Sequence, residues 1–514
     1  MHKILRNLSM VFFVPFTALS LLILVVTSVT TIYYDTDQEA DLPRFGGQNF
    51  LWLIVGVCLF GFILYFFTKT HKKWLLPAAV CIEALLCLVL IFTSRAVAVT
   101  DGLTLDEVIN AFDLGDYSSL FKGGYMFVYP FQIGYVAIGQ IISRIFGPSN
   151  YLVYQLINLL SIVVSVIFLH KTTKELFGDD FVCDIFDVLS LSMFFLFSYV
   201  TYVYNDVWSL APGILALYFE ICYLKKHAVK DELSAALFLG IGCMLKTNLY
   251  IALIAMAILL FVDFLEYLLN NGEELLKRCL INLCFVVLLA VMAVCPLKLI
   301  GSIYAGKAGL SEYPKGVPSS TYFAMAMQEG EGEWGWYNGF NRNTFNDMDY
   351  DRELTDKAAK MAISERISEF SKRPLHAIKF YMRKFLSQWA DPTHISIRNY
   401  ELSMRHSESK SVFAYSLVYG IWSRIFQGIM DIAHFMVYLG VCIYCLFTIK
   451  KKSLDLPQAL LILFVFGGML FHEIWEGSSR YIIRYYLTLL PFAAYGISRL
   501  ILFVSKALSG RKRH

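Results

Sequence analysis

Residues 11–33 read VFFVPFTALSLLILVVTSVTTIY, an apolar run without a single charged side chain. A helix needs about 20 such residues to cross the hydrocarbon core of a membrane. Other runs that approach or exceed this length occupy 50–67, 75–93, 251–267, 280–300 and 485–504. A large soluble all-α enzyme would instead need polar faces on its helices. The sequence therefore predicts an all-α integral membrane protein.

The composition agrees with this prediction. Hydrophobic residues make up 57% of the 514 residues and charged residues only 17%, whereas charged residues make up roughly 25% of an average soluble protein. The first apolar run follows Lys3 and Arg6, as it would in a signal peptide, but it is too long and no small-residue cleavage site closes it. We expect it to be retained as the first span.

Lysine and arginine in short loops set the orientation of a membrane protein, because such loops stay in the cytoplasm. Basic clusters recur between the apolar runs, at 71–73, 171–174, 225–227, 277–278, 450–452 and 511–513. Placing every cluster inside gives about twelve transmembrane helices, with both termini cytoplasmic.

One apolar segment, residues 131–146, does not fit as a span, because a crossing there would invert every later basic cluster. We predict a juxtamembrane or re-entrant helix on the outer face instead. Just upstream, apolar residues repeat at helical spacing and polar residues take the other side, respectively Leu105, Val108, Ile109, Phe112 and Asp106, Glu107, Asn110, Asp113. This pattern predicts a second helix, lying flat in the interface.

These patterns divide the chain into four parts. They are two additional N-terminal transmembrane helices (1–74), a transmembrane core (75–301) with a first outer loop (98–150), an extracytoplasmic loop region (302–428), and C-terminal transmembrane helices with a basic cytoplasmic tail (429–514). The loop region contains two amphipathic helical stretches, near 355–371 and 375–389. It has no cysteine, so in an oxidising exterior it would be built without disulfides.

Polar residues at span ends on one side of a membrane indicate a functional face. Asp101 directly follows the third span and could accept a proton from a hydroxyl as a general base, or serve only as loop polarity. Asp206 opens a later apolar run, where it is either a helix N-cap or part of a site.

Two cations stand on the same predicted face. The run 233–267 is best explained as a hairpin of two spans that turns at Lys246. A lysine on the outer face is expected to bind an anion, either a lipid phosphate or a substrate phosphate. Arg480 lies in the turn between the last two spans and could bind phosphate oxygens or pair with Glu476.

Aromatic residues beside amides and acids occur at 335–338 (GWYN) and 388–393 (QWADPT), with Trp336, Asn338 and Trp389 as candidates for sugar binding. Such residues equally suit contact with lipid headgroups. The sequence has no Walker motif, GxGxxG or EF-hand loop, and residues 472–476 (HEIWE) depart from HExxH. These features give no support for nucleotide-driven transport or a zinc site.

Taken in order, these pieces resemble the GT-C superfamily of polytopic membrane glycosyltransferases, in particular a family-39-like branch of Gram-positive bacteria. The resembling residues begin near 75 and include Asp101, Tyr129-Pro130-Phe131-Gln132, Tyr204-Asn205-Asp206, Leu245-Lys246-Thr247-Asn248, the two aromatic motifs and Trp475–Tyr481. The sequence departs from the superfamily where Gly102 follows Asp101 and the next acids are Asp106 and Glu107, so it leaves open which acid acts.

The resemblance implies transfer of a sugar on the outer membrane face, from a polyprenyl-phosphate donor to a glycan, teichoic acid or protein acceptor, with inversion at the anomeric carbon. Asp101 would be the base, and Lys246 and Arg480 would hold the phosphate. Asp206 would bind a metal or position the acceptor, and a single divalent ion, Mg²⁺ or Mn²⁺, is left open. Tyr129, Gln132, Trp336, Asn338, Trp389 and Glu476 would contact substrates.

Two other functions remain as alternatives. A flippase or transporter of a lipid-linked glycan or small solute would carry charges near span centres, where Glu83 is one example. A non-catalytic scaffold would explain the loop region but not an acid, a lysine and an arginine on one face. The expected partners are the lipid-linked donor, the acceptor and membrane lipid, and nucleic acid is not expected.

Overall fold

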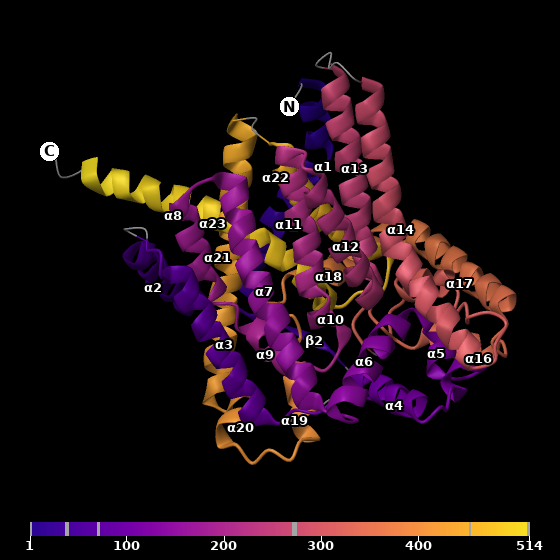
Figure 1. Ribbon diagram of the computed structural model, residues 1–514. Coiled ribbons are helices and arrows are strands. Elements are labelled where there is room, and N and C mark those ends of the chain that lie inside the picture. Colours follow the sequence, from indigo (N-terminus) through magenta and orange to yellow (C-terminus); the bar gives the residue numbers. More distant parts are fainter. Residues whose placement is uncertain are drawn as a thin grey trace.

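The computed structural model describes residues 3–35, 41–68, 72–269, 275–330, 332–451 and 454–510. It is an all-α membrane bundle, and the described residues contain one sheet, a two-stranded hairpin (Figure 1). The basic tail at 511–513 and parts of the clusters at 71–73 and 450–452 lie outside the described residues.

Within the described residues, ten segments are long and apolar enough to cross a membrane, or up to twelve if each of two bent helix pairs is one span. The long helices are α1 (Lys3–Val29), α2 (Phe50–Thr68), α3 (Leu75–Ser94), α7 (Tyr151–Phe177), α11 (Leu210–Lys226), α12 (Val229–Leu245), α13 (Tyr250–Leu269), α14 (Leu275–Lys307), α21 (Ile421–Lys451), α22 (Leu456–Ile474) and α23 (Ser479–Gly510). The predicted polytopic fold is thus confirmed, as is the hairpin that turns at Lys246, between α12 and α13.

Short elements connect the long helices. They are β1 (Thr30–Tyr34), β2 (Pro43–Gly47), α4 (Asp101–Asp113), η1 (Ser118–Leu120), α5 (Tyr125–Val128), η2 (Pro130–Gln132), α6 (Ile133–Phe146), α8 (Asp180–Ser190), α9 (Phe194–Ser198), η3 (Tyr199–Thr201), α10 (Asn205–Trp208) and η4 (Thr247–Leu249). The segment 118–128 meets 130–146 at 100°. A bend of this size fits the expected juxtamembrane or re-entrant helix better than a straight span.

The expected helix after Asp101 is α4, which packs against α6 through an apolar face that includes Leu105, Ile109 and Phe112. The sequence pattern predicted a polar opposite face, but one of the acids on that face is buried. Asp106 is only 4% exposed, because its carboxylate accepts hydrogen bonds from the hydroxyls of Ser149 and Tyr151, at 2.7 and 2.9 Å.

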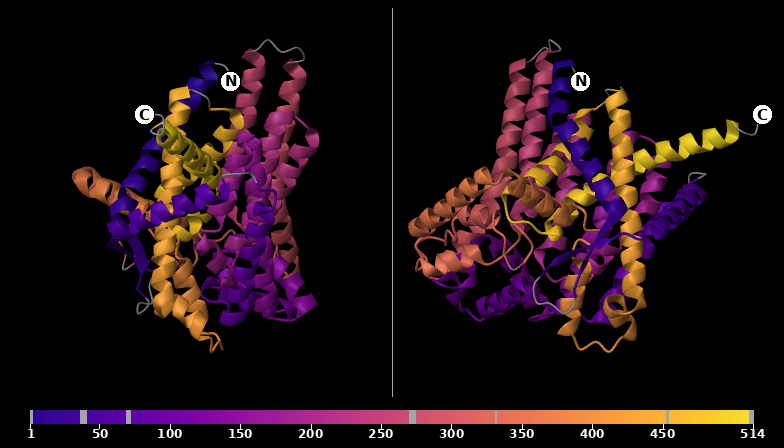
Figure 2. Two further views of the ribbon diagram at one scale, coloured as in Figure 1. Left: turned by 90° about the vertical axis from the view of Figure 1, so that its left-hand side faces the viewer. Right: turned by 180° about the vertical axis from the view of Figure 1, so that it is seen from behind.

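The loop region 302–428 is helical. It contains α15 (Ser319–Met325), α16 (Phe340–Asp347), α17 (Arg352–Lys372), α18 (Pro374–Trp389), α19 (Ser396–Arg405) and α20 (Val412–Tyr419). The two predicted stretches are therefore confirmed as helices, α17 and α18, and of the two only α18 has a distinctly apolar face. In Figure 1 the ends of α16 and α20 lie with α4 and α6 in the lower half of the molecule, away from the N-terminus, and the two turned views agree (Figure 2).

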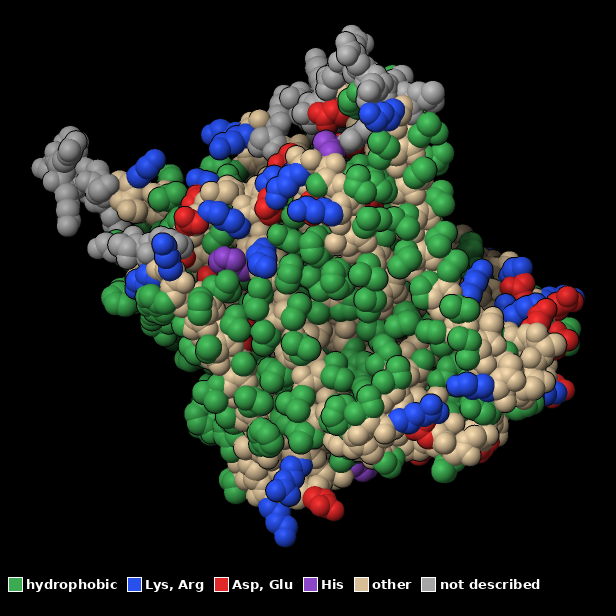
Figure 3. Space-filling model, in the orientation of Figure 1, with side chains coloured by type: hydrophobic (Ala, Val, Ile, Leu, Met, Phe, Trp, Pro, Cys, Tyr) green, Lys and Arg blue, Asp and Glu red, His purple; other side chains and the backbone are tan. Residues whose placement is uncertain are grey.

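Charge is unevenly distributed over the surface. In Figure 3, lysine and arginine side chains gather over the upper part of the face, above a broad belt of hydrophobic side chains. Such an asymmetry is typical of a membrane protein whose basic loops lie on one side. Within the bundle, the carboxylate of Glu83 accepts a hydrogen bond from Ser190 Oγ at 2.7 Å, so this intramembrane acid links α3 to α8.

The helices α21 and α23 cross where two glycines meet. A Cβ placed on Gly496 would lie 1.8 Å from the carbonyl oxygen of Gly440, and one on Gly440 would lie 2.4 Å from that of Ala493. Small residues allow this close backbone approach, which is a main source of helix association in membranes.

We therefore predict that Gly496→Ala destabilises the protein by about 1–3 kcal/mol, because the two backbones must move apart. Thermal unfolding of the detergent-purified protein measures the loss as a lower Tm. The control is Gly61→Ala in α2, where a Cβ meets nothing within 4 Å. An unchanged Tm in Gly496→Ala would contradict the close packing of α21 on α23.

Candidate active site

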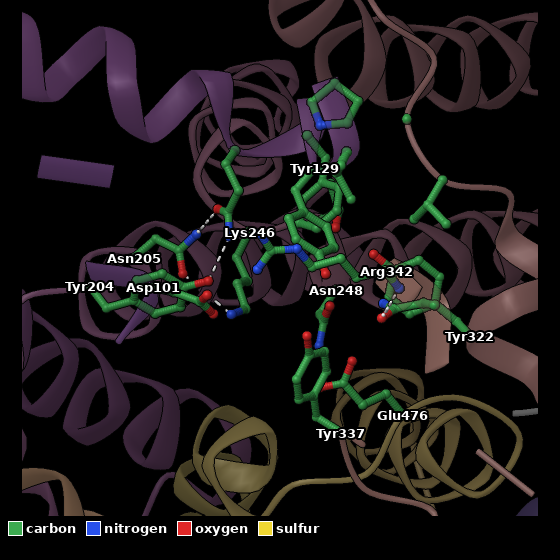
Figure 4. A pocket seen from close by; sticks show the side chains of 18 of the residues that line it. Asp101, Tyr129, Tyr204, Asn205, Lys246, Asn248, Tyr322, Tyr337, Arg342 and Glu476 are labelled. Atoms are coloured by element: carbon green, nitrogen blue, oxygen red, sulfur yellow. Dashed lines mark hydrogen bonds between the residues drawn. The ribbon is translucent and has the colours of Figure 1, made fainter. Parts of the chain in front are cut away.

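A cavity of about 700 Å³ lies between the first outer loop, the α12–α13 turn, the loop region and the α22–α23 turn. Six of the residues singled out from the sequence line it, namely Asp101, Tyr129, Gln132, Lys246, Glu476 and Arg480. Figure 4 shows Asp101, Asn205 and Lys246 on one side of this cavity, and Tyr322 and Arg342 on the other. Segments far apart in the sequence thus meet around one space.

Asp101 is the first residue of α4, where the positive end of the helix dipole favours a carboxylate. The preceding Thr100 has φ +51° and ψ −132°, a backbone conformation that a β-branched residue rarely adopts. Gly102 follows because a Cβ there would lie 2.2 Å from the carbonyl oxygen of Val203. The glycine that follows Asp101, where the sequence departs from the superfamily, is therefore required by packing. Strained backbone like that of Thr100 is concentrated at functional sites.

Asp206 is the centre of a buried charge cluster. Its carboxylate lies 2.8 Å from Lys246 Nζ, 3.2 Å from Arg480 Nε and 3.6 Å from Arg484 Nη2. It is 3% exposed and is absent from the cavity lining. Asp206 lies in the first turn of α10, whose N-cap is Tyr204, so its carboxylate holds cations rather than capping the helix. The three cations outnumber the one carboxylate that they contact directly, and two acids of the cavity, Asp41 and Glu476, interact with Arg480 at longer range.

A hydrogen-bond chain runs from the first outer loop to this cluster. The amide of Asn205 donates to Gln132 Oε1 at 2.8 Å and to the carbonyl of Leu245 at 2.9 Å, and its Oδ1 accepts from Lys246 Nζ at 3.3 Å. The rings of Tyr204 and Tyr481 flank the Lys246 ammonium, with centroids 5.0 and 5.1 Å away. Burial lowers the pKa of Lys246 to about 8.

The turn between α22 and α23 supplies Glu476 and Arg480. These two residues do not form the pair that would steady the turn. Arg480 bonds to Asp206 and to the hydroxyl of Tyr202, and Glu476 accepts a hydrogen bond from the Tyr481 hydroxyl at 2.7 Å. Burial raises the pKa of Glu476 above its ordinary value.

This turn is fastened to the loop region. Lys384 of α18 is fully buried and donates to three carbonyl oxygens, those of Ala326, Glu473 and Trp475, at 2.8–2.9 Å. The amide of Gly477 also donates to the carbonyl of Gly335 at 2.9 Å. The loop region therefore fixes the position of the turn that carries Glu476 and Arg480.

The three remaining candidates do not line the cavity. Trp336 is buried and donates its indole N–H to Ser387 Oγ at 3.1 Å. The side chain of Asn338 bonds to Gln328 and to the backbone N–H of Phe340. Trp389 is fully buried and packs on Phe385 and Tyr485. The structure places all three in support of the cavity wall, without contact to its interior.

Other lining residues were not assigned a role from the sequence. They include Tyr125, Tyr204, Asn248, Tyr322, Tyr337, Arg342 and Tyr481. Four of them stand inside or beside the motifs quoted above, so position within a motif was an available signal. Arg484 was also missed, although it lies one helical turn after Arg480 and on the same face of α23.

A divalent metal has little support from these side chains. Among the described residues, no group of three or more His, Cys, Asp or Glu side chains is arranged to hold a metal ion. Asp206, the candidate ligand, is already surrounded by three cations, which would repel a metal. We derive no step of the chemistry through a metal.

Residues 132–297 match the family model described as dolichyl-phosphate-mannose-protein mannosyltransferase. No curated protein matches the chain. The matched segment contains Gln132, Asn205, Asp206 and Lys246, which form the inner wall of the cavity and the charge cluster behind it. The match and the polytopic helical fold together support a membrane glycosyltransferase of the GT-C superfamily.

Proposed function

We propose that the protein transfers a sugar from a polyprenyl-phosphate donor to a hydroxyl group of an envelope glycan or other acceptor, with inversion, on the extracytoplasmic face. The observation that carries this proposal is a single cavity that a carboxylate, Asp101, shares with Lys246 and Arg480. An anionic leaving group and an incoming hydroxyl require these two kinds of side chain.

The charge cluster suits the change of charge in such a reaction. A polyprenyl-phosphate sugar is a phosphodiester with one negative charge, and the departing polyprenyl phosphate is a monoester that gains a second. Lys246 and Arg480 face the cavity, with Arg484 behind them, so positive charges stand ready to oppose the negative charge that develops. Interactions that strengthen in the transition state accelerate the reaction.

Asp101 would accept the proton of the acceptor hydroxyl as its oxygen attacks the anomeric carbon. The bond between that carbon and the phosphate oxygen breaks on the opposite side, and the electron pair leaves with the phosphate. Phosphate is a good leaving group, so no general acid is needed. Glu476, whose pKa burial raises, would bond to a sugar hydroxyl beside it.

The extracytoplasmic position rests on charge asymmetry. The basic clusters at 171–174 and 225–227 lie at the ends of α7 and α11, opposite to the ends that approach the cavity. With those clusters inside, the cavity, the loop region 302–428 and the β1–β2 hairpin face outward, and both termini are cytoplasmic.

The alternative, a flippase or transporter, would use charged groups along a pathway through the bundle. The buried acids of the bundle are instead engaged locally. Glu83 bonds to Ser190, and the carboxyl groups of Glu220 and Glu232 face each other. None of these three acids lines a cavity described here, which favours the enzyme.

The base is tested by Asp101→Asn. We predict a fall of about 10²–10⁴-fold in kcat for transfer of labelled hexose from synthetic polyprenyl-phosphate hexose to envelope extract, because general-base catalysis contributes a factor of this size. Glu107→Gln, an exposed acid on the same helix, is the matched control and retains activity.

Two results would contradict this assignment. Full activity in Asp101→Asn would move the base to another acid that lines the cavity, Glu476 or Asp41. Absence of transfer by the wild type with a panel of donor sugars and acceptors would support the transporter.

The phosphate site predicts a pH dependence. Lys246, with a pKa lowered to about 8, is a cation below that pH and becomes neutral above it. As pH increases through about 8, the KM for the donor should therefore rise and kcat should fall, because Lys246 contacts both the bound donor and the developing charge. In Lys246→Arg this rise should disappear, since a guanidinium stays charged. A KM profile that is equally pH-dependent in both proteins would exclude Lys246 as the titrating group.

Orientation can be checked independently of activity. Alkaline phosphatase, which folds only outside the cytoplasm, should be active when inserted after Lys372 in the loop region and inactive when fused after the last residue. The reverse pattern would place the cavity on the cytoplasmic face.

A further inference from the structure

A second cavity, of about 550 Å³, lies on the other side of the β1–β2 hairpin. We call it the hairpin cavity. Its walls come from the hairpin, the first turn of α2, the α19 region and one face of α21. The hairpin joins the two N-terminal helices and lies outside the segment that matches the family model. Seven of the sixteen residues that line this cavity come from the N-terminal segment, and all sixteen lie outside the segment that matches the family model.

The hairpin cavity combines exposed aromatic rings with hydrogen-bonding groups of both kinds. Tyr33 and Trp52 are 45% and 47% exposed. On α21, Gln427 donates to Thr31 Oγ1 and to the carbonyl of Ile32, and Asp431 accepts from Thr31 Oγ1 at 2.6 Å. Aromatic faces beside amides and a carboxylate suit the apolar faces and hydroxyl groups of a sugar.

The charges of this cavity distinguish a neutral ligand from an anionic one. Arg398 is paired with Glu401 and with Asp41, and Arg424 and Asp431 contribute one charge of each sign. There is no excess of cations like that around Asp206. A phosphate-bearing ligand would gain little here, whereas a neutral saccharide needs no counter-charge.

The location of the hairpin also favours a water-soluble ligand. A two-stranded ribbon has two open edges, and hydrocarbon would leave their backbone groups without hydrogen bonds. The hairpin must therefore face water on the side where the cavity opens or be covered by protein. A lipid acyl chain is a poor occupant for such a place.

Only one layer of side chains separates the hairpin cavity from the candidate active site. The Tyr34 hydroxyl donates to Asp391 Oδ2 at 2.8 Å and lies 3.0 Å from Ser479 Oγ, next to Arg480. Asp41 lines the active cavity and lies 3.6 Å from Arg398, which lines the hairpin cavity. A ligand held by the hairpin is thus adjacent to the site of transfer.

We propose that the hairpin cavity binds non-reacting sugar residues of a neutral glycan acceptor and so selects polymeric over single-sugar acceptors. Its role in acceptor choice rests on the proposed glycosyltransferase function. Binding of the saccharide itself does not, which allows the two to be tested separately.

The binding test uses the full-length protein in phosphatidylcholine nanodiscs. The probe is envelope polysaccharide freed of phosphodiesters by hydrofluoric acid. We expect it to slow hydrogen exchange of the hairpin residues 30–34 and 43–47, and we expect Trp52→Ala and Gln427→Ala to abolish this protection. Trp74→Ala, which removes a similarly exposed tryptophan at the N-cap of α3, is the control.

The activity test compares the same polysaccharide with the methyl glycoside of its sugar. Trp52→Ala and Gln427→Ala should raise the KM for the polymer about 10-fold, the usual effect of removing a central contact, and leave kcat and transfer to the methyl glycoside unchanged. An equal loss with both acceptors would mean a structural role and overturn the proposal.

Two further outcomes are decisive. If phosphatidylglycerol vesicles slow hydrogen exchange of the hairpin and the polysaccharide does not, the occupant is a lipid headgroup and the proposal is wrong. Protection by the polysaccharide in a wild-type protein that transfers no sugar would overturn the proposed function and retain the saccharide site.

Discussion

The contact of Asp206 with three cations is the interaction on which the rest of the site depends. The four residues come from three parts of the fold: Asp206 from α10, Lys246 from the α12–α13 turn, and both Arg480 and Arg484 from α23. Isolated charges of this kind could not remain buried, and removing the acid from such a cluster costs about 3–5 kcal/mol. The same contact holds the helices together and places Lys246 and Arg480 at the cavity.

Around this centre, tight backbone contacts set the position of the acid across the cavity. Gly102 lets α4 approach the carbonyl of Val203, and the unusual conformation of Thr100 turns the chain into α4 at Asp101. Val203 lies three residues before Asp206. The segment that carries Asp206, the counter-ion of the three cations, therefore also fixes the position of Asp101, the proposed base. A small shift in either would change the distance between acid and cations.

Much of this arrangement could be predicted from the sequence. Apolar run lengths and basic clusters predicted the bundle, the hairpin at Lys246 and the helices near 355–371 and 375–389, because these features depend on local pattern and on transfer into lipid. The meeting of Asp101, Lys246 and Arg480 could be expected from a shared face. The sequence could not show that Asp206 would bind Arg484, that Asp106 would be buried with Ser149 and Tyr151, or that Trp389 would turn into the core. Those outcomes depend on tertiary contacts between distant segments, which have no periodic signal.

The three carbonyl bonds of Lys384 have a consequence for motion. They tie the loop region to the turn between α22 and α23, deep in protein and away from water. Separating the loop region from this turn would have to break all three bonds together and leave a lysine without acceptors in a dry interior. The loop region and this turn therefore move as one unit, and the turn that carries Glu476 and Arg480 keeps its position relative to the loop region.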